Sequence, residues 1–462
     1  MRYVSTRDTS KTFEFKDVFI KGLADDGGLF IPEKLTKYTE NEVKDFKKLS
    51  YSELAKKIVH PFIGNFMSQP ELSKIIDKSY SKFRRDNVVD FIKLGDRTVL
   101  ELFHGPTLAF KDVAMQLLGN FYEYYLNNEN QKINIVVATS GDTGAAAIDA
   151  IKGKKNVNIF VLHPDNRVSP VQRKLMTTGK DENVFNIAIK GNFDDCQNLV
   201  KSMFADKKFS NDIKMSGVNS INWARIIAQS VYYFYSYSLV EDTSEPTNFS
   251  VPTGNFGDVY AGYLAKKMGL PINKLIVATN QNDILHRCLS TGEYRMGDVI
   301  PSISPSMDIQ ISSNFERAMF DAYDRDGATI ANVMNELKTN GGFALSQGVM
   351  DALRENFDSG RVSEAETSAE ITHCLAAHAE LLCPHSAIGT QVADRLRDAN
   401  TPMITLATAH PAKFPDAVEA ATGVRPPLPP RMSDLFDRDE RMTRVDNNLD
   451  ALMAIVKDRI KN

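Results

Sequence analysis

The feature of the sequence that most constrains the fold is a regular alternation of short apolar runs and helical segments. The apolar runs lie at 133–138, 157–162, 184–189, 249–251, 275–278 and 403–407. Helical segments follow several of them, such as the alanine-rich stretch that ends near Ile151 and the stretch that ends near Met268. Strands that alternate with helices are typical of βαβ units, which form parallel sheets. The sequence therefore predicts an α/β protein.

Several local expectations accompany this pattern. The dipeptide His163-Pro164 is predicted to end the strand at 157–162, and helices are predicted at 169–178 and 194–204. Residues from about 290 to 400 are predicted to be mostly helices and loops. The aromatic cluster at 232–237 has no basic neighbours, so we expect a buried helix or strand there rather than a base-stacking surface.

The length of 462 residues predicts two or three domains, each large enough for its own core. The first hundred residues differ from the rest, with turn glycines at 22–30 and a helical pattern at 52–66. We expect an N-terminal module over 1–97, and two open parallel-sheet lobes within 98–462. The Pro-rich stretch 425–431 is expected to be an extended connector.

Charge, cysteines and terminal composition restrict the function. The chain has 55 Lys plus Arg and 59 Asp plus Glu, a net charge of −4 that gives no support to nucleic-acid binding. Four widely spaced cysteines form no C-x-x-C pair, which favours free, mostly buried thiols. The eight histidines do not cluster at ligand spacing, so no metal is required. No leader and no 18-residue apolar run is visible, so we expect a cytoplasmic protein without a membrane span. As a separate expectation, the protein is a monomer or a homodimer.

Two glycine-containing turns stand where a strand meets a helix. Gly254-Asn255-Phe256-Gly257-Asp258 could direct backbone N–H groups and a helix N-terminus at a phosphate. The turn 140–144, Ser-Gly-Asp-Thr-Gly, offers two hydroxyls for a carboxylate or phosphate. Each turn also has a simpler explanation, because tight βα turns contain glycine for backbone conformation alone. The motifs G-x-G-x-x-G, G-x-x-x-x-G-K-[ST], H-E-x-x-H and G-x-S-x-G are missing.

Lys111 is the third candidate, in a segment that is otherwise mostly apolar, Phe103 to Asp112. A desolvated lysine has a lowered pKa and reacts as a nucleophile, as Schiff-base chemistry requires. The competing interpretation is a surface lysine paired with Asp112, and the local spacing alone favours it.

The order of these features along the chain resembles the fold type II pyridoxal-phosphate enzymes, which are related to the tryptophan synthase β subunit. Within that group the sequence is most similar to the threonine synthase family, in its longer bacterial and fungal branch. The motifs that carry the resemblance are GLADDGGLFIP (22–32), FHGPTLAFKD (103–112), ATSGDTGAAA (138–147), NSINWARI (219–226), PTGNFGD (252–258) and ATAHPAKFPD (407–416).

The resemblance implies a pyridoxal 5'-phosphate cofactor and a role for each matching residue. Lys111 would form the Schiff base and move protons, and Thr408 would hydrogen-bond the pyridine nitrogen. Ser140 and Thr143 would hold the substrate α-carboxylate. The residues implied around the cofactor phosphate are Gly254, Asn255, Phe256, Gly257 and Asp258. Many relatives of the wider fold type have Asn where this chain has Asp142, which leaves the contact to the cofactor 3-oxygen open.

The resemblance also implies a reaction: O-phospho-L-homoserine and water would give L-threonine and phosphate, the last step of threonine biosynthesis. The candidates for the substrate phosphate are Asn222, Arg225 and Lys413, all inside these motifs. Two enzymes on the same scaffold are alternatives, a catabolic phospho-lyase that yields 2-oxobutyrate and a serine/threonine dehydratase. A cofactor-free binding protein is a further alternative, disfavoured by the presence of Lys111.

Overall fold

The structure is a computed structural model that describes residues 1–139, 141–166, 168–238, 246–398 and 400–461. Its residues group into two compact units. The large unit comprises residues 1–104, 220–411 and 415–426, and the small unit comprises 105–219, 412–414 and 427–462. The Pro-rich stretch passes from one unit to the other between Pro426 and Pro427. It lacks regular structure up to Pro429, as predicted, but Pro430 and Arg431 begin a short 3-10 helix.

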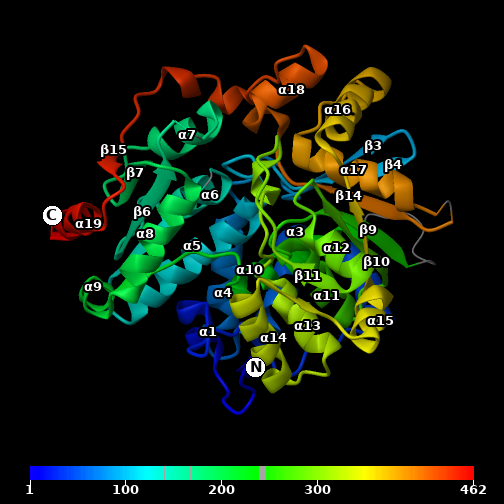
Figure 1. Cartoon of the computed structure of the whole chain (residues 1–462), viewed down its shortest axis with the longest axis horizontal. Coiled ribbons are helices and arrows are strands. Elements are labelled where there is room, and N and C mark those ends of the chain that lie inside the picture. Colours follow the sequence, from blue (N-terminus) through cyan, green and yellow to red (C-terminus); the bar gives the residue numbers. More distant parts are fainter. Residues whose placement is uncertain (140, 167, 239–245, 399, 462) are drawn as a thin grey trace. The chain divides into compact units, whose positions relative to one another are not determined.

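The large unit is built on a six-stranded sheet (Figure 1). Its strands are, in spatial order, β13 (Phe357–Arg361), β10 (Ile272–Thr279), β9 (Thr247–Pro252), β14 (Met403–Ala407), β4 (Arg97–Glu101) and β3 (Asp90–Leu94). Neighbours run parallel from β13 to β4, and only the edge strand β3 is antiparallel. Every residue of the central strand β9 is buried, as expected for a parallel strand covered on both faces.

Helices and two short antiparallel ribbons complete the large unit. The ribbons pair β1 (Tyr3–Ser5) with β2 (Phe30–Pro32) and β11 (Glu293–Arg295) with β12 (Gly342–Ala344). The helices are α1 (Phe15–Lys21), α2 (Glu40–Asp45), α3 (Tyr51–Ile63), α4 (Gln69–Tyr80), α10 (Trp223–Ser238), α11 (Gly257–Lys267), α12 (Ile284–Thr291), α13 (Phe315–Ala322), α14 (Gly327–Asn340), α15 (Gln347–Asn356), α16 (Glu364–His378), α17 (Pro384–Leu396) and α18 (Pro415–Thr422).

The first hundred residues pack into the large unit through side chains that bind backbone carbonyls. Arg317, on α13, donates from Nε to the Phe30 carbonyl at 3.0 Å. Helix α3 begins at a capping box in which Ser50 and Glu53 satisfy each other's backbone amides. Residues 1–104 belong to the large unit together with 220–411. A separate N-terminal module that ends at residue 97 therefore stays a prediction.

The small unit contains a five-stranded, wholly parallel sheet. Its strands are, in spatial order, β15 (Thr443–Asp446), β7 (Val184–Lys190), β6 (Val157–Pro164), β5 (Ile133–Ala138) and β8 (Met215–Ser216). Its helices are α5 (Lys111–Asn128), α6 (Asp142–Ile151), α7 (Pro170–Thr177), α8 (Phe193–Ala205), α9 (Lys207–Asp212) and α19 (Leu449–Lys461). The core beside the sheet includes Phe160, Ile187 and Leu452, all buried.

The predicted α/β class with two parallel-rich sheets is confirmed, and one local prediction was wrong. Strand β6 does not stop before His163-Pro164 but includes both residues, because a proline is tolerated at a strand end where its missing N–H breaks no internal bond. The region 290–400 is mostly helices and loops, as predicted, but it also contains β13, an edge strand of the large sheet. Its sequence, Phe-Asp-Ser-Gly-Arg, has one apolar residue and therefore lacks a strand pattern.

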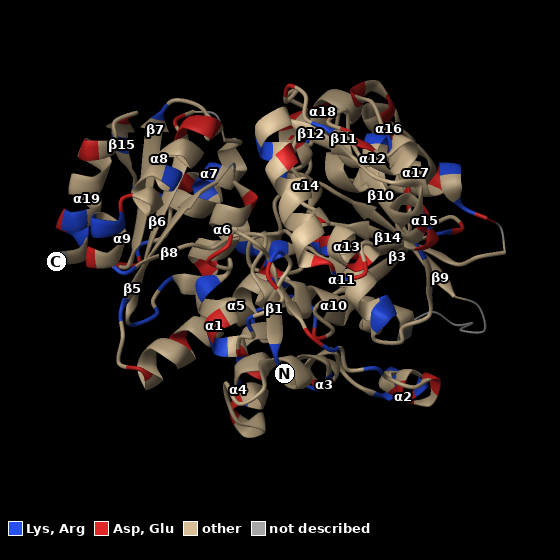
Figure 2. Cartoon of the chain, turned by 60° about the horizontal axis from the view of Figure 1, so that its bottom comes forward, with Lys and Arg blue, Asp and Glu red and all other residues tan. Residues whose placement is uncertain are grey.

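Two predictions about buried side chains agree with the structure. The aromatic cluster lies in α10, where Tyr232, Tyr233 and Phe234 are buried. All four cysteines are buried and unpaired by disulfides. Among the described helices, none has both the length and the apolar character that crossing a bilayer demands. Figure 2 shows acidic and basic residues beside one another on outer helices such as α19.

Candidate active site

The glycine-containing loop of the large unit lies between the carboxyl end of β9 and the start of α11. Phe256 adopts a left-handed conformation, with φ of 61°, and directly precedes the helix. Gly254 packs against backbone, since a Cβ there would lie 3.0 Å from the Ser306 carbonyl oxygen. The loop is therefore a tight turn that only a small residue at 254 permits.

A neighbouring segment fixes the direction of the peptide groups in this loop. Ser312 Oγ donates to the Gly254 carbonyl at 2.7 Å, and Asn314 donates from its backbone N and from Nδ2 to the Asn255 carbonyl, at 3.1 and 3.0 Å. A trans peptide holds its C=O and N–H on opposite sides. The amides of Asn255 and Phe256 therefore point away from residues 312–314, beside the first amides of α11. Such a group of N–H donors suits a phosphate.

Asp258 lies in the first turn of α11, and its carboxylate is held by two tyrosines of α10. Tyr232 donates its hydroxyl to Asp258 Oδ1, and the Tyr233 hydroxyl lies 3.0 Å from the same atom. Burial, followed by the nearby Asp258 charge, raises the pKa of both tyrosines well above the usual range, so they remain neutral donors. A phosphate contact by Asp258 would accordingly use its backbone amide.

Thr408 lies at the same edge of the large sheet as the loop. It follows β14, which pairs with β9 so that Thr405 is opposite Ser250. Because both strands run parallel, Thr408 and the residues after Pro252 emerge at neighbouring carboxyl ends, the position where such sheets bind ligands. Thr408 is buried, and its backbone N–H donates to Ser386 Oγ at 3.2 Å.

Arg225 is a buried cation in the first turn of α10. Among the described residues, none accepts a hydrogen bond from its Nε or Nη1 atoms. Burial lowers the pKa of its guanidinium to about 10. By contrast, the side-chain amide of Asn222 already binds backbone groups. Its Nδ2 donates to the Phe19 carbonyl at 2.8 Å, and its Oδ1 accepts from the Ala224 amide at 3.0 Å. A buried guanidinium with unpaired donors indicates a site for an anion.

Lys111 belongs to the small unit, where it is the first residue of α5. Its Nζ lies 3.4 Å from Asp142 Oδ2 and 4.9 Å from the ring centre of Phe110. The predicted alternative, a surface lysine paired with Asp112, is wrong: the Lys111 side chain is 12% exposed, and Asp112 instead accepts bonds from Thr107. Burial raises the pKa of Asp112 to about 6, although the Thr107 bonds act in the opposite direction.

The second glycine turn precedes α6, close to Lys111. Thr139 Oγ1 accepts hydrogen bonds from the amides of Gly141 and Gly144, at 3.0 and 2.9 Å. Thr143 is partly exposed in the first turn of α6, so its hydroxyl is available to a ligand. Ser140, the other predicted contact to the substrate carboxylate, lies outside the described residues.

Lys413 is fully buried in the small unit, and no sequence motif indicates its partners. Its Nζ lies 2.7 Å from Asp142 Oδ1 and donates to the Thr107 carbonyl at 2.8 Å. Gln172 Nε2 donates to the same Asp142 oxygen at 2.9 Å. Lys413 and Gln172 are far from Asp142 in the sequence, so no local spacing could have revealed this cluster.

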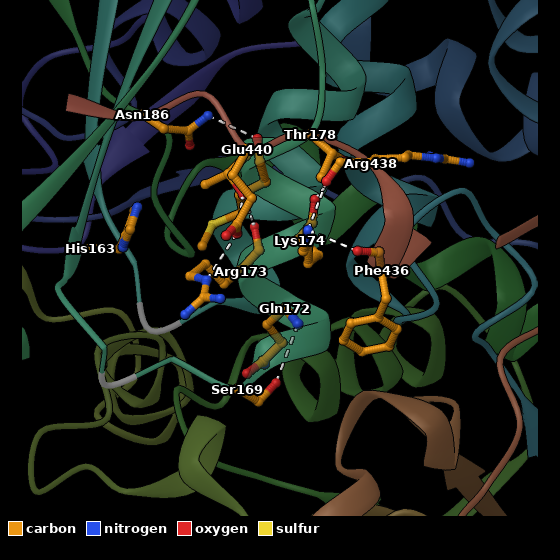
Figure 3. A network of polar contacts seen from close by, with 12 residues as sticks. His163, Ser169, Gln172, Arg173, Lys174, Thr178, Asn186, Phe436, Arg438 and Glu440 are labelled. Atoms are coloured by element: carbon orange, nitrogen blue, oxygen red, sulfur yellow. Dashed lines mark hydrogen bonds and ion pairs between the residues drawn. The ribbon is translucent and has the colours of Figure 1, made fainter. Parts of the chain in front are cut away.

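Helix α7, which carries Gln172, is held by hydrogen bonds and an ion pair at its start and along its length. Ser169 caps its start by accepting the Gln172 amide at 3.3 Å (Figure 3). Farther along, Arg173 pairs with Glu440 at 2.9 Å, and Lys174 donates to the carbonyls of Phe436 and Arg438. The C-terminal segment therefore holds the helix that presents Gln172 to Asp142.

These groups fit pyridoxal 5'-phosphate. Each of its functional parts needs a different protein group: an amine for the aldehyde, N–H donors for the phosphate and a partner for the ring nitrogen. The small unit supplies a lysine with little exposure, Lys111. The large unit supplies the loop amides of 254–258 and, at the same sheet edge, the hydroxyl residue Thr408. Each unit, taken by itself, thus holds groups of a kind that this cofactor requires.

Comparison with known proteins agrees with a pyridoxal-phosphate cofactor. Residues 2–80 match the family described as threonine synthase N terminus, 98–337 match pyridoxal-phosphate dependent enzyme, and 386–456 match threonine synthase, C-terminal. A threonine synthase of Pseudomonas aeruginosa is 48% identical over 459 residues, which cover 99% of this chain and 98% of that protein. The Saccharomyces cerevisiae threonine synthase is 45% identical, covering 91% of this chain and 88% of that protein.

Solved structures give the same result. The pyridoxal-phosphate-bound threonine synthase from Brucella melitensis superposes with a TM-score of 0.97 at 48% identity, covering 99% of both chains. The Escherichia coli threonine synthase gives a TM-score of 0.84 at 30% identity, covering 99% of this chain and 100% of that one. The fold is therefore that of the fold type II enzymes, and the chain belongs to the threonine synthase family of pyridoxal-phosphate-dependent enzymes.

Proposed function

We propose that this protein converts O-phospho-L-homoserine and water into L-threonine and phosphate. The observation that carries the proposal is the full-length likeness to threonine synthases, 48% identity over 99% of the chain. The structure adds an independent argument from chemistry. Besides the loop that suits the cofactor phosphate, the large unit holds a buried cation with unpaired donors, Arg225, which suits a second anionic group.

The residues around the cofactor have separable roles. The cofactor supplies an electron sink that stabilises negative charge at the substrate α-carbon. Lys111 would hold the cofactor covalently and, once released by the substrate amine, would take and return protons at the substrate carbons. The amides of 254–258 would orient the cofactor phosphate. Thr408 would donate or accept one hydrogen bond at the ring nitrogen, and a neutral hydroxyl there does not favour a protonated ring.

The substrate contacts follow from what each side chain is free to do. Thr143 is partly exposed at the start of α6 and would hydrogen-bond the α-carboxylate, together with Ser140. Of the three candidates for the substrate phosphate, Asn222 and Lys413 already bind protein groups. Arg225 retains unpaired N–H donors in the fixed geometry that phosphate oxygens match. We therefore assign the substrate phosphate to Arg225.

Product analysis tests the proposal against its alternatives. The cofactor-loaded protein is incubated with O-phospho-L-homoserine, and phosphate, amino acids and keto acids are quantified. Equimolar threonine and phosphate would support a threonine synthase. Phosphate with 2-oxobutyrate and ammonia would instead identify the phospho-lyase. Turnover of serine or threonine, without inhibition by phosphate analogues, would identify the dehydratase.

A further inference from the structure

The small unit surrounds one buried carboxylate, Asp142, with two lysines. Lys413 is 2.7 Å from Oδ1 and fully buried, whereas Lys111 is 3.4 Å from Oδ2. One positive charge is enough to neutralise one carboxylate, and in a buried site the closer, dry ion pair dominates. The geometry thus gives the two lysines different electrostatic tasks.

We propose that Lys413 is the counter-charge of Asp142, and that this ion pair leaves Lys111 able to lose its proton before it reacts with the cofactor aldehyde. Lys413 is in this view a positioning residue. The reaction it serves is simple: the Lys111 ammonium gives one proton to solvent, its nitrogen adds to the aldehyde carbon, and the carbonyl oxygen leaves as water. The inference rests on the cofactor role proposed for Lys111.

Several contacts fix Lys413 in this task. Besides Asp142 it holds the Thr107 carbonyl at 2.8 Å, and its own carbonyl accepts a bond from Ser169 Oγ at 3.1 Å. Thr107 in turn donates from its amide and hydroxyl to Asp112, the residue after Lys111. The ion pair and the start of α5 therefore share one bonded framework, so Lys413 cannot move to another partner without breaking it.

In the described part of the small unit, charged side chains near Lys111 come from several segments. Asp112 comes from α5 itself, Asp142 from α6 and Lys413 from the segment 412–414. Beyond them, Asp149 and Arg431 act on Asp112 with opposite signs. Lys413 is the positive group of this set that binds Asp142 directly. Without Lys413, the negative charge of Asp142 would be less compensated, and the Lys111 ammonium beside it would hold its proton more strongly.

The experiment measures how the reactivity of Lys111 depends on pH. The protein is first freed of cofactor. Its rate of reconstitution with pyridoxal 5'-phosphate is then followed by visible absorption from about pH 6 to about pH 10. Borohydride trapping and mass spectrometry confirm attachment at Lys111. If the wild-type protein forms no adduct at Lys111, the proposed cofactor role fails, independently of the role of Lys413.

Lys413→Met is the informative variant, because it removes the charge at similar length. We expect the midpoint of its pH profile to rise by about one unit or more, which makes reconstitution about tenfold slower below the midpoint. Asp142→Asn should move the midpoint down. The double variant Lys413→Met/Asp142→Asn, which removes both charges, should return it to near the wild-type value, and Lys413→Arg should keep it there.

Two controls separate this effect from a general loss of structure. Lys154→Met removes another lysine of low exposure, which pairs with Glu123 roughly 18 Å farther along α5, and should leave the midpoint unchanged. Circular dichroism verifies folding. A folded Lys413→Met protein with an unchanged midpoint would overturn the proposal. If Lys413→Met does not fold, an unchanged midpoint in Asp142→Asn would overturn it equally.

Discussion

Ser312 Oγ donates a hydrogen bond of 2.7 Å to the carbonyl of Gly254, and this bond helps to set the direction in which the phosphate-loop amides point. Ser312 lies outside all of the sequence motifs, so the sequence did not indicate this contact. Its amide donates to the Tyr294 hydroxyl at 2.7 Å, so the residue is held on both sides. The loop is therefore oriented by a residue that lies outside the motifs.

Ser312→Ala should weaken cofactor binding. Loss of one buried hydrogen bond leaves the Gly254 carbonyl without this donor, which costs about 1 kcal/mol or somewhat more. We expect the dissociation constant for pyridoxal 5'-phosphate to rise about five- to twentyfold, measured by fluorescence titration of the cofactor-free protein. Ser346→Ala is the control, because Ser346 is exposed and its hydroxyl does not cap its helix. Equal affinities of wild type and Ser312→Ala would contradict the role given to this bond.

Arg225→Met should separate stability from substrate binding. Removal of a buried, unpaired cation should leave the melting temperature equal or higher, because a desolvated charge disappears. Meanwhile kcat/KM for O-phospho-L-homoserine should fall about tenfold to a hundredfold or more, through loss of charge-assisted hydrogen bonds. Calorimetry with inorganic phosphate should show weaker binding, and cofactor affinity should not change. A variant that melts earlier but keeps its kcat/KM would assign Arg225 to the fold alone.

Asp112 should make stability depend on pH. Its pKa in the folded protein is about 6, above the value of an unfolded aspartate, so the folded state binds its proton more tightly. The associated stability is fully present below about pH 4 and is lost as the pH rises through 6. Relative to Asp112→Asn, the wild-type free energy of unfolding should therefore fall by roughly 1–3 kcal/mol between pH 4 and 7.

Urea unfolding at a series of pH values measures this difference. Asp298→Asn, at an exposed position, serves as the control and should follow the wild-type curve. A constant difference between wild type and Asp112→Asn across this pH range would show that Asp112 keeps the same protonation state in the folded and unfolded protein.

Thr408→Val should retain the shape of the side chain but remove the hydroxyl proposed to meet the ring nitrogen. We expect cofactor affinity to fall about threefold to tenfold, the effect of one hydrogen bond, with a shift in the visible spectrum of the bound cofactor. Thr408→Ser should restore both properties. An unchanged spectrum and affinity in Thr408→Val would place the ring nitrogen elsewhere.

The parts of the fold that were predictable are those whose stability is encoded locally. Strand β5 is a continuous apolar run, Ile133–Ala138, and both of its ends agree with the prediction. Strand β13 forms because β10 offers a parallel partner, and its own sequence carries little strand signal. The glycine loop was visible because a glycine allows the close approach of another backbone segment, here the Ser306 carbonyl oxygen, which would lie 3.0 Å from a Cβ at position 254.

The supporting residues of the site were not visible. Ser312 and Asn314 bind loop carbonyls from a segment without a recognisable motif. The ion pair of Asp142 and Lys413 joins positions that only the folded chain brings together. Sequence patterns therefore indicated the groups that we propose to face a ligand, whereas the groups that hold those residues in place required the structure.

Incorporation of oxygen from water is the most direct test of the central claim. The reaction is run in ¹⁸O-labelled water with O-phospho-L-homoserine, and both products are examined by mass spectrometry. If the γ-phosphate leaves by C–O cleavage and water adds at the β-carbon, the label appears in the threonine hydroxyl and the released phosphate carries none. Labelled phosphate accompanied by homoserine would reveal simple phosphate-ester hydrolysis and would contradict the assignment as a threonine synthase.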